Sequence, residues 1–285
     1  MTTTLANARK QLSKEIGDYW DSTSTSSGSS TTIVDTALKA KANDWISDAP
    51  QEMYDLVTSG TYVDEERKIS SLDNTTGTLT TLAHGGTIAS GVTYEVHRLF
   101  SASEKRRALI TAAQTAFPSI FNPVRDISLQ IDDSDIGTGI DISSLGLLNN
   151  TPNRISQAPE DDSTDEYWAT LRNWHVESDG KLYLREGTPS YYLKIEGIGY
   201  LDFLVSGVSS TLWTSTIAIN TPQLYILTAE AIVYLYTQLI MPNFTSGDRK
   251  ELEPILEFWV KKAEYSKSKY KMLPPPATIK YGGIL

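Results

Sequence analysis

The sequence contains no cysteine and only three histidines in 285 residues. The lack of cysteine excludes disulfide bonds, thiolate metal sites and cysteine nucleophiles. The histidines, His84, His97 and His175, have no spacing that suits a shared metal ion and lie in no recognised catalytic motif. We therefore interpret all three as surface or structural residues, and the sequence predicts neither a metal site nor a cofactor.

The common motifs of enzymes are missing as well. The chain has no G-x-S-x-G elbow, no G-x-x-x-x-G-K-[ST] phosphate loop and no complete dinucleotide fingerprint. Two adjacent carboxylate pairs, Asp132–Asp133 and Asp161–Asp162, are of the kind that a glycosidase or a divalent cation uses. Both pairs fall in polar stretches that we expect to be loops, where a solvated surface explains them. We predict that the chain is not an enzyme and has no catalytic residues.

Positive charge is scarce, because 25 Lys and Arg face 35 Asp and Glu and give a net charge of −10. Tight nucleic-acid binding requires a basic surface, so this balance argues against it. An acidic protein can nevertheless line a passage for DNA, since like charge keeps the polymer from adhering to the wall.

No uninterrupted apolar run is long enough for a membrane span. The most apolar stretch, residues 222–241, contains Gln223, Glu230 and Gln238 and is better explained as a buried helix. The first ten residues lack the pattern of a secretory signal. We expect a soluble protein that makes no contact with a membrane.

Aromatic residues, in contrast, are plentiful, with six Trp and fifteen Tyr. Tyr and Trp suit both core packing and large protein interfaces, because each combines a wide apolar area with a polar tip. Their number favours a subunit of an assembly. Several gather in the second half of the chain: Trp168, Trp174, Tyr183, Tyr191, Tyr192 and Tyr200.

Four helices are expected from apolar residues spaced three and four apart. The first runs from about Leu5 to Tyr19, and a central helix at 102–117 follows the Ser101-x-x-Glu104 capping pattern. Residues 222–241 and 251–271 form a helical hairpin. In the second hairpin helix we expect one buried stripe, made by Leu252, Ile255, Leu256, Trp259, Val260 and Ala263.

The remaining segments predict strands. We expect an α+β fold, namely a helical bundle with antiparallel β-modules and an extended C-terminal tail. The expected parts are an N-terminal helix with a Ser/Thr-rich linker (1–31), a small antiparallel β-module (32–100), a helix plus a second β-region closed by the hairpin (101–271), and the tail (272–285). The polar stretch 21–32 is either a flexible linker or a segment that threads between subunits of a ring.

Several segments in a fixed order resemble the β-module of head-to-tail adaptor (connector) proteins of tailed bacteriophages. In order, they are Met53-Tyr-Asp-Leu-Val-Thr-Ser-Gly-Thr-Tyr62, Glu66-Arg-Lys-Ile-Ser-Ser-Leu72, Thr76-Gly-Thr-Leu-Thr80 and Gly91-Val-Thr-Tyr-Glu-Val96. The helix 104–117, Phe121-Asn-Pro-Val-Arg-Asp126, Leu171-Arg-Asn-Trp-His-Val176 and the closing helical pair match the usual continuation. The resemblance spans about residues 32–271 and depends on the order of its pieces, since each piece alone is generic.

This resemblance implies a structural virion protein of the neck, assembled in the host cytoplasm. It would form a dodecameric homo-oligomeric ring between the portal protein and the tail or nozzle proteins, with double-stranded DNA passing through without sequence-specific binding. The family often uses a C-terminal extension to reach the portal. Candidates for that docking here are Lys280, Tyr281, Ile284 and Leu285, which supply a cation, an aromatic anchor and apolar ends; a disordered tail is the alternative.

Other functions stay open at this point. The β-module would also suit another neck, tail or baseplate protein of the particle. Less favoured are a virion-associated glycan hydrolase, which would use the acidic pairs, and a cell-surface binding module.

Overall fold

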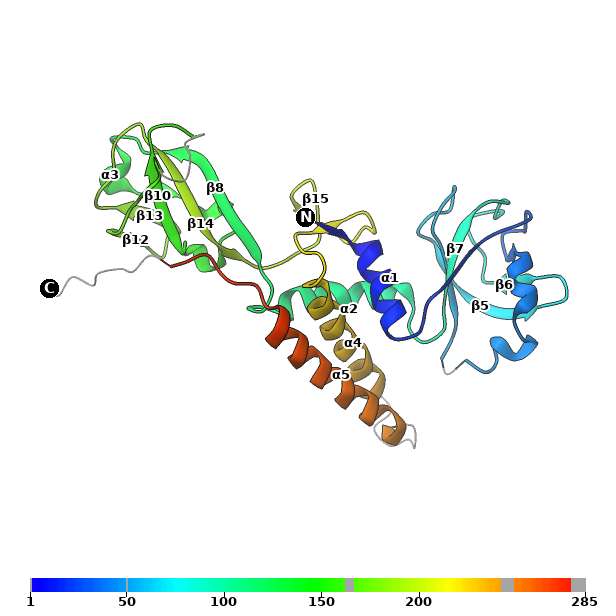
Figure 1. Ribbon diagram of the computed structural model, residues 1–285. Helices are drawn as coiled ribbons and strands as arrows, with labels where there is room; N and C mark the ends of the chain where they lie inside the picture. Colours follow the sequence, from blue (N-terminus) through cyan, green and yellow to red (C-terminus); the bar gives the residue numbers. More distant parts are fainter. Residues whose placement is uncertain (1, 50, 162–166, 242–248, 278–285) are drawn as a thin grey trace. The chain divides into compact units, whose positions relative to one another are not determined.

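A computed structural model describes residues 2–49, 51–161, 167–241 and 249–277, apart from the side chains of residues 43 and 136. The chain forms two compact units. Unit 1 comprises Met1–Ala116 and Phe203–Tyr270, and unit 2 comprises Phe117–Asp202 and Lys271–Leu285. Residues 117–202 of unit 2 are therefore inserted into unit 1, and each unit is described separately (Figure 1).

Unit 1 contains a six-stranded antiparallel half-barrel. Its strands, in spatial order, are β2 (Trp20–Thr23), β7 (Thr93–His97), β4 (Tyr54–Val57), β5 (Glu66–Asp73), β6 (Thr78–Thr81) and β3 (Thr32–Val34). Strands β2 and β3 lie at opposite edges of this sheet. An antiparallel bridge pairs Ser26, in the segment after β2, with Val34 of β3. Along β7 the buried apolar side chains of Tyr94 and Val96 alternate, as the period of two requires, and Tyr94 is fully buried in the core of the half-barrel.

The turn between β5 and β6 follows directly from its sequence. The Asp73 carboxylate accepts a hydrogen bond from the Thr75 N–H at 2.9 Å, which forms an Asx turn. Gly77 has a φ of +74°, a conformation that side chains with a Cβ rarely adopt. The Thr76-Gly77 signal in the sequence therefore does mark a hairpin.

The Ser/Thr-rich stretch lies along the half-barrel and is tied to it by hydrogen bonds. Buried Ser24 donates through Oγ to the Ala89 carbonyl at 2.7 Å and accepts from the Val92 N–H at 3.0 Å. The Gly28 N–H donates to the Ile88 carbonyl at 2.9 Å. Small polar side chains satisfy backbone groups here, so this segment is an ordered part of the module. The short 3₁₀ helices η1 (Thr36–Ala40) and η2 (Asn43–Trp45) follow β3.

Four helices complete unit 1: α1 (Leu5–Glu15), α2 (Ala102–Thr115), α4 (Leu224–Ile240) and α5 (Arg249–Tyr270). Helix α4 packs against the other three, and its Ala, Leu and Ile side chains are mostly buried. A small sheet lies beside α1, with the order β1 (Thr3–Thr4), β17 (Thr216–Ile217), β15 (Leu204–Val205) and β16 (Val208–Ser209).

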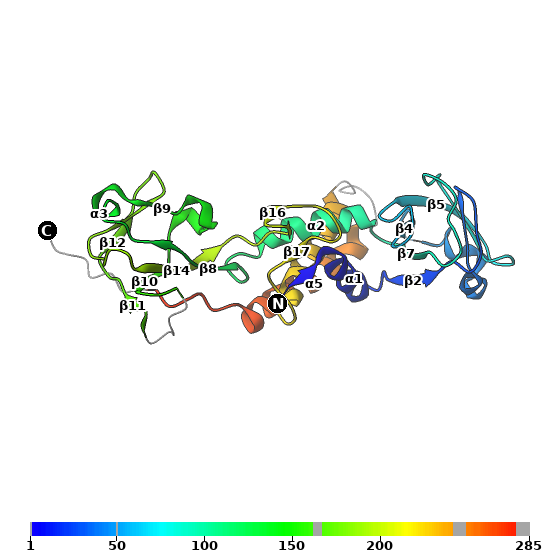
Figure 2. The same ribbon diagram turned by 90° about the horizontal axis from the view of Figure 1, so that it is seen from above.

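Unit 2 is built on antiparallel strands (Figure 2). One sheet has the order β11 (Ala169–Thr170), β10 (Arg154–Ala158), β14 (Tyr192–Gly199) and β8 (Asn122–Gln130). The other has the order β12 (Trp174–Val176), β13 (Lys181–Leu184) and β9 (Ile140–Asp141). The short helices are α3 (Asp135–Thr138), η3 (Ser143–Leu145) and η4 (Leu148–Asn150). Both sheets contribute to one apolar core, which includes Ile155, Trp174 and Leu193.

The expectation of a helical bundle with modest β-modules is wrong. The described part of the chain is a β-rich α+β protein, in which seventeen strands form four antiparallel sheets. The error has a physical cause: long helices give a strong periodic signal, whereas many of these strands contain only two to four residues. Within the described ranges, no helix combines the length and apolarity that crossing a bilayer demands.

Candidate functional site

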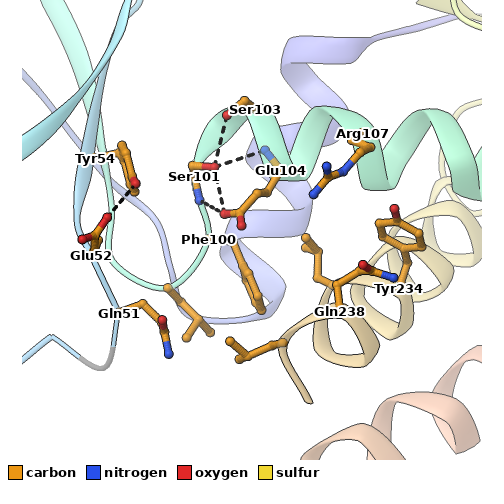
Figure 3. Close-up of a pocket in the computed structure, with 13 residues that line it drawn as sticks. Gln51, Glu52, Tyr54, Phe100, Ser101, Ser103, Glu104, Arg107, Tyr234 and Gln238 are labelled. Atoms are coloured by element: carbon orange, nitrogen blue, oxygen red, sulfur yellow. Dashed lines mark hydrogen bonds between the residues drawn. The ribbon is translucent and has the colours of Figure 1, made fainter. Parts of the chain in front are cut away.

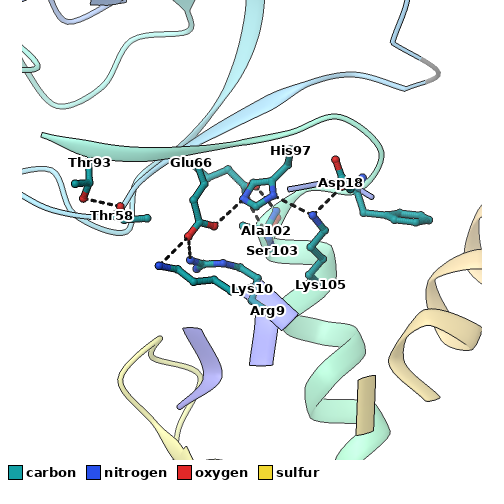
Figure 4. Close-up of polar contacts among 12 residues, drawn as sticks. Arg9, Lys10, Asp18, Thr58, Glu66, Thr93, His97, Ala102, Ser103 and Lys105 are labelled. Carbon is teal, nitrogen blue, oxygen red and sulfur yellow. Dashed lines mark hydrogen bonds and ion pairs between the residues drawn. The ribbon is translucent and has the colours of Figure 1, made fainter. Parts of the chain in front are cut away.

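The most concentrated group of buried ionisable side chains lies where α1, β7 and α2 meet (Figure 4). Lys105 on α2 places its Nζ 2.8 Å from Asp18 Oδ2 and 2.9 Å from His97 Nδ1. Asp18 also accepts the backbone N–H groups of residues 98, 99 and 100 in the turn between β7 and α2. One carboxylate thus neutralises a buried ammonium group and fixes the turn that leads into α2.

The contacts of His97 determine which of its nitrogens carries the proton. The Lys105 ammonium group can only donate, so Nδ1 accepts and the proton lies on Nε2. This nitrogen faces Glu95 Oε2 at 3.6 Å, beyond hydrogen-bond distance. Burial, together with the positive charges of Lys105 and Arg9, lowers the pKa of His97 well below 6.5. The imidazole is therefore neutral at physiological pH.

A second buried pair lies next to this cluster. Arg9 of α1 contacts Glu95 of β7 at 2.8 Å, and both side chains are almost completely buried. The Arg9 guanidinium also stacks over Trp213, 4.2 Å from the ring centroid. The half-barrel is therefore joined to the helices by charge pairs that are shielded from water.

This buried cluster is suited to holding elements together and not to turning over a substrate. Its side chains line neither of two cavities in unit 1, of about 500 and 410 Å³. Burial is the main cause of the lowered pKa of Lys105, which the nearby Asp18 carboxylate opposes. A group with a shifted pKa marks a reactive site only when it lies in a cleft, and here the shift accompanies a closed structural contact.

The two other histidines lie apart from this cluster. His84 is enclosed in the half-barrel, with Nε2 3.1 Å from Asp55 Oδ2 and Nδ1 3.3 Å from Glu65 Oε2. Burial raises the pKa of Asp55, and the neighbouring His84 opposes that rise. His175 is exposed, stacks on Tyr183 and lies 3.4 Å from Glu177. Among the described residues, no group of three or more His, Asp or Glu is arranged to hold a metal ion.

The acidic pairs do not form a site with these histidines. Asp132 and Asp133 are exposed in the loop that precedes α3, and the Asp132 N–H donates to Asp135 Oδ2 at 2.9 Å. Asp161 is also exposed, whereas Asp162 lies outside the described residues. Asp132, Asp133 and Asp161 thus lie in polar loops, as the sequence pattern predicts.

A cavity of about 500 Å³ in unit 1 lies between β4, the start of α2 and α4 (Figure 3). Phe100 and Leu235 contribute apolar surface, and Tyr54 and Arg107 contribute polar groups. Glu104 also lines it, but its carboxylate accepts both the N–H and the Oγ–H of Ser101 at 2.8 Å as part of the capping box of α2. Ser101 and Glu104 are used in this cap, and the rest of the lining is mixed, with Gln51 and Gln238 beside the apolar side chains.

Some apolar side chains of helix α5 are exposed and not packed in the core. The sequence pattern does not reveal which ones. Its buried side chains are Trp259, Ala263 and Ser266. Ile255 and Val260, which we expected in the buried stripe, are 39% and 38% exposed. The spacing of apolar residues shows which side of a helix is apolar. It does not show whether that side is covered by the chain's own core or is exposed.

The predicted portal-docking residues, Lys280, Tyr281, Ile284 and Leu285, lie outside the described residues. The segment leading to them starts from Met272, whose N–H donates to the Ser119 carbonyl at 2.9 Å. Leu273 follows with 81% of its side chain exposed.

Comparison with models of known protein families, with curated proteins and with solved structures finds no match to this chain.

The pKa of His97 predicts that acid destabilises the folded chain. Below pH 6.5 the unfolded chain protonates this residue and the folded chain does not, so the free energy of unfolding falls as pH decreases, by up to about 1.4 kcal/mol per pH unit. His97→Gln should flatten this dependence between about pH 5 and 7. The measurement is denaturant unfolding followed by tryptophan fluorescence. The control, His175→Gln at an exposed site, should keep the wild-type slope, and an unchanged slope in His97→Gln would contradict the assignment.

Removing the charge of Asp18 should be costly. Asp18→Asn leaves the buried Lys105 without its counter-ion and disturbs the turn at residues 98–100, so we expect a loss of about 3–5 kcal/mol in the free energy of unfolding. The exposed Asp48 provides a matched control, since Asp48→Asn should change stability by less than about 0.5 kcal/mol. Equal free energies of unfolding for the two variants would show that the Asp18–Lys105 pair is not needed for stability.

Proposed function

We propose that this chain is a non-enzymatic structural protein of a tailed-phage virion, the subunit of a head-to-tail adaptor ring. In this role, copies of the chain surround a channel for DNA in the neck, between the portal protein and the tail or nozzle proteins. This role requires binding to the neighbouring copies and to the portal and tail proteins, and it needs neither a cofactor nor a catalytic group.

The observation that carries the proposal is the order of the segments that resemble the adaptor module. They correspond to β4, β5, β6 and β7, which are neighbours in one sheet in the order β7-β4-β5-β6. Helix α2 begins at Ala102, only a short turn after β7 ends at His97. The motifs thus belong to one continuous structural unit that leads directly into a helix, as the resemblance requires. Scattered motifs would not have supported the proposal.

The surface chemistry agrees with an assembly subunit. Several large apolar side chains are more than half exposed, among them Phe258, Tyr265, Leu212 and Val208. Phe258 and Tyr265 are seven residues apart on α5 and so lie on one side of it, and exposed apolar side chains grouped in this way commonly mark protein interfaces. The net charge of −10 suits a wall past which DNA slides without adhering.

The place of the chain in a particle can be tested directly. An epitope tag joined to residue 285 should be incorporated into particles during infection, and electron microscopy with gold-labelled antibody should find the tag at the junction of head and tail. Gold at the baseplate, along the tail or over the capsid would instead indicate another structural role. Particles that contain no copy of the chain would overturn the virion assignment altogether.

The proposed portal contact predicts that the tail is required for joining. Deleting residues 274–285 should abolish portal binding and leave unjoined heads and tails, because the docking candidates are removed. Binding is measured by co-sedimentation with purified portal. A full-length variant in which Lys280, Tyr281, Ile284 and Leu285 are all alanine separates side-chain recognition from tail length. Normal joining by the truncated chain would reject the docking role of the tail without rejecting the ring.

A further inference from the structure

We propose that the outer side of α5 is the contact through which one copy of this chain docks onto the β unit, residues 117–202, of a second copy. This assignment deepens the proposed adaptor ring and rests on it, because it names the two different surfaces that would meet around such a ring.

The docking surface, called here the α5 row, consists of Ile255, Phe258, Lys262, Tyr265 and Lys269. Positions three and four apart lie on one side of a helix, so these side chains form a continuous line next to the buried face. Phe258 and Tyr265 are 59% and 60% exposed. An exposed phenylalanine and an exposed tyrosine two turns apart are the kind of aromatic anchors that dominate protein interfaces.

A groove of about 270 Å³ lies beside the α5 row, between α1, α4 and α5. Tyr225, Tyr265 and Tyr270 line it together with Gln11 and Glu15. Lys262 lies over the Trp259 ring at 4.1 Å and is 3.4 Å from Glu15 Oε2, which holds its stem along the groove. The surface therefore offers both projecting aromatic side chains and a recess for a side chain of the partner.

The distribution of charge identifies a second copy as the occupant. Helices α1, α2, α4 and α5 contain twelve Lys and Arg against seven Glu; without Arg9 and Lys105, which are buried and paired with acidic side chains outside these helices, the balance is ten against seven, a net +3. Residues 117–202 contain six Lys and Arg against fifteen Asp and Glu, a net −9. The chain thus carries a basic helical surface and an acidic β unit, and two copies are electrostatically complementary.

The β unit also offers apolar side chains that the α5 row can meet. Ile127 on β8 and Tyr200 after β14 are 37% and 58% exposed. DNA is a poorer occupant, since phosphates do not match Ile255 and Phe258 and the whole chain repels a polyanion with its charge of −10. Because the α5 row and the β unit are different surfaces, each copy offers both, and their contact can repeat head-to-tail from copy to copy around a ring.

Photo-crosslinking of the full-length chain tests this contact. Benzoyl-phenylalanine replaces Phe258 or Tyr265, and Leu82, which is equally exposed at 58% but lies in the half-barrel module, provides the control position. Isotopically heavy and light copies are mixed at concentrations up to about 1 mM, so that weak contacts are populated. Crosslinks that join heavy to light peptides then come only from contacts between copies.

We expect heavy–light crosslinks from positions 258 and 265 to residues 117–202, few from position 82, and a yield that falls as salt screens the charges. The double variant Phe258→Ser/Tyr265→Ser should weaken self-association at least about tenfold, whereas Leu82→Ser should not. Crosslinks from α5 to α5, crosslinks only to added duplex DNA, or no heavy–light product would each overturn the contact. Gold label at the neck together with any of these results would retain the adaptor role and reject this interface alone.

Discussion

The buried carboxylate of Asp18 is the constraint on which unit 1 depends. It lies just after α1, accepts the N–H groups of the turn between β7 and α2, and holds the Lys105 ammonium group 2.8 Å away. A lysine enclosed without such a partner would lose its charge or open the core. The Arg9–Glu95 pair and the neutral His97 surround this contact. The half-barrel and the helices therefore meet through specific polar contacts as well as apolar packing.

Part of this architecture could be predicted from sequence, because some signals are local. The Ser101–Glu104 capping box marks the start of α2, and the Asp73–Gly77 turn marks a hairpin. The amount of sheet was underestimated, since a strand of two residues has no period to detect. The Ser/Thr-rich stretch looked like a linker because its stability comes from distant partners such as Ala89.

The sequence predicts less of the buried cluster around Lys105 than of the fold. Arg9 and Lys105 are residue types that normally lie at the surface, and only the tertiary fold brings Glu95, Asp18 and His97 to them. The three histidines were interpreted as structural or surface residues, and their environments agree with that interpretation. On α5, periodicity identified apolar positions but could not tell which of them the chain itself covers, as the exposure of Ile255 demonstrates.

The insertion of unit 2 into unit 1 affects the order in which the chain can fold. Helix α2 ends at Thr115, and α4, which covers it, begins at Leu224. On the ribosome, about a hundred residues must be added between these points, which takes roughly 5 to 20 seconds. Until α4 is made, the side of α2 that it covers lacks this partner, and all the strands of unit 2 are synthesised in that interval. Helices α4 and α5, which are made after these strands, thus complete unit 1, and a truncated chain that ends before α4 would leave that apolar side uncovered.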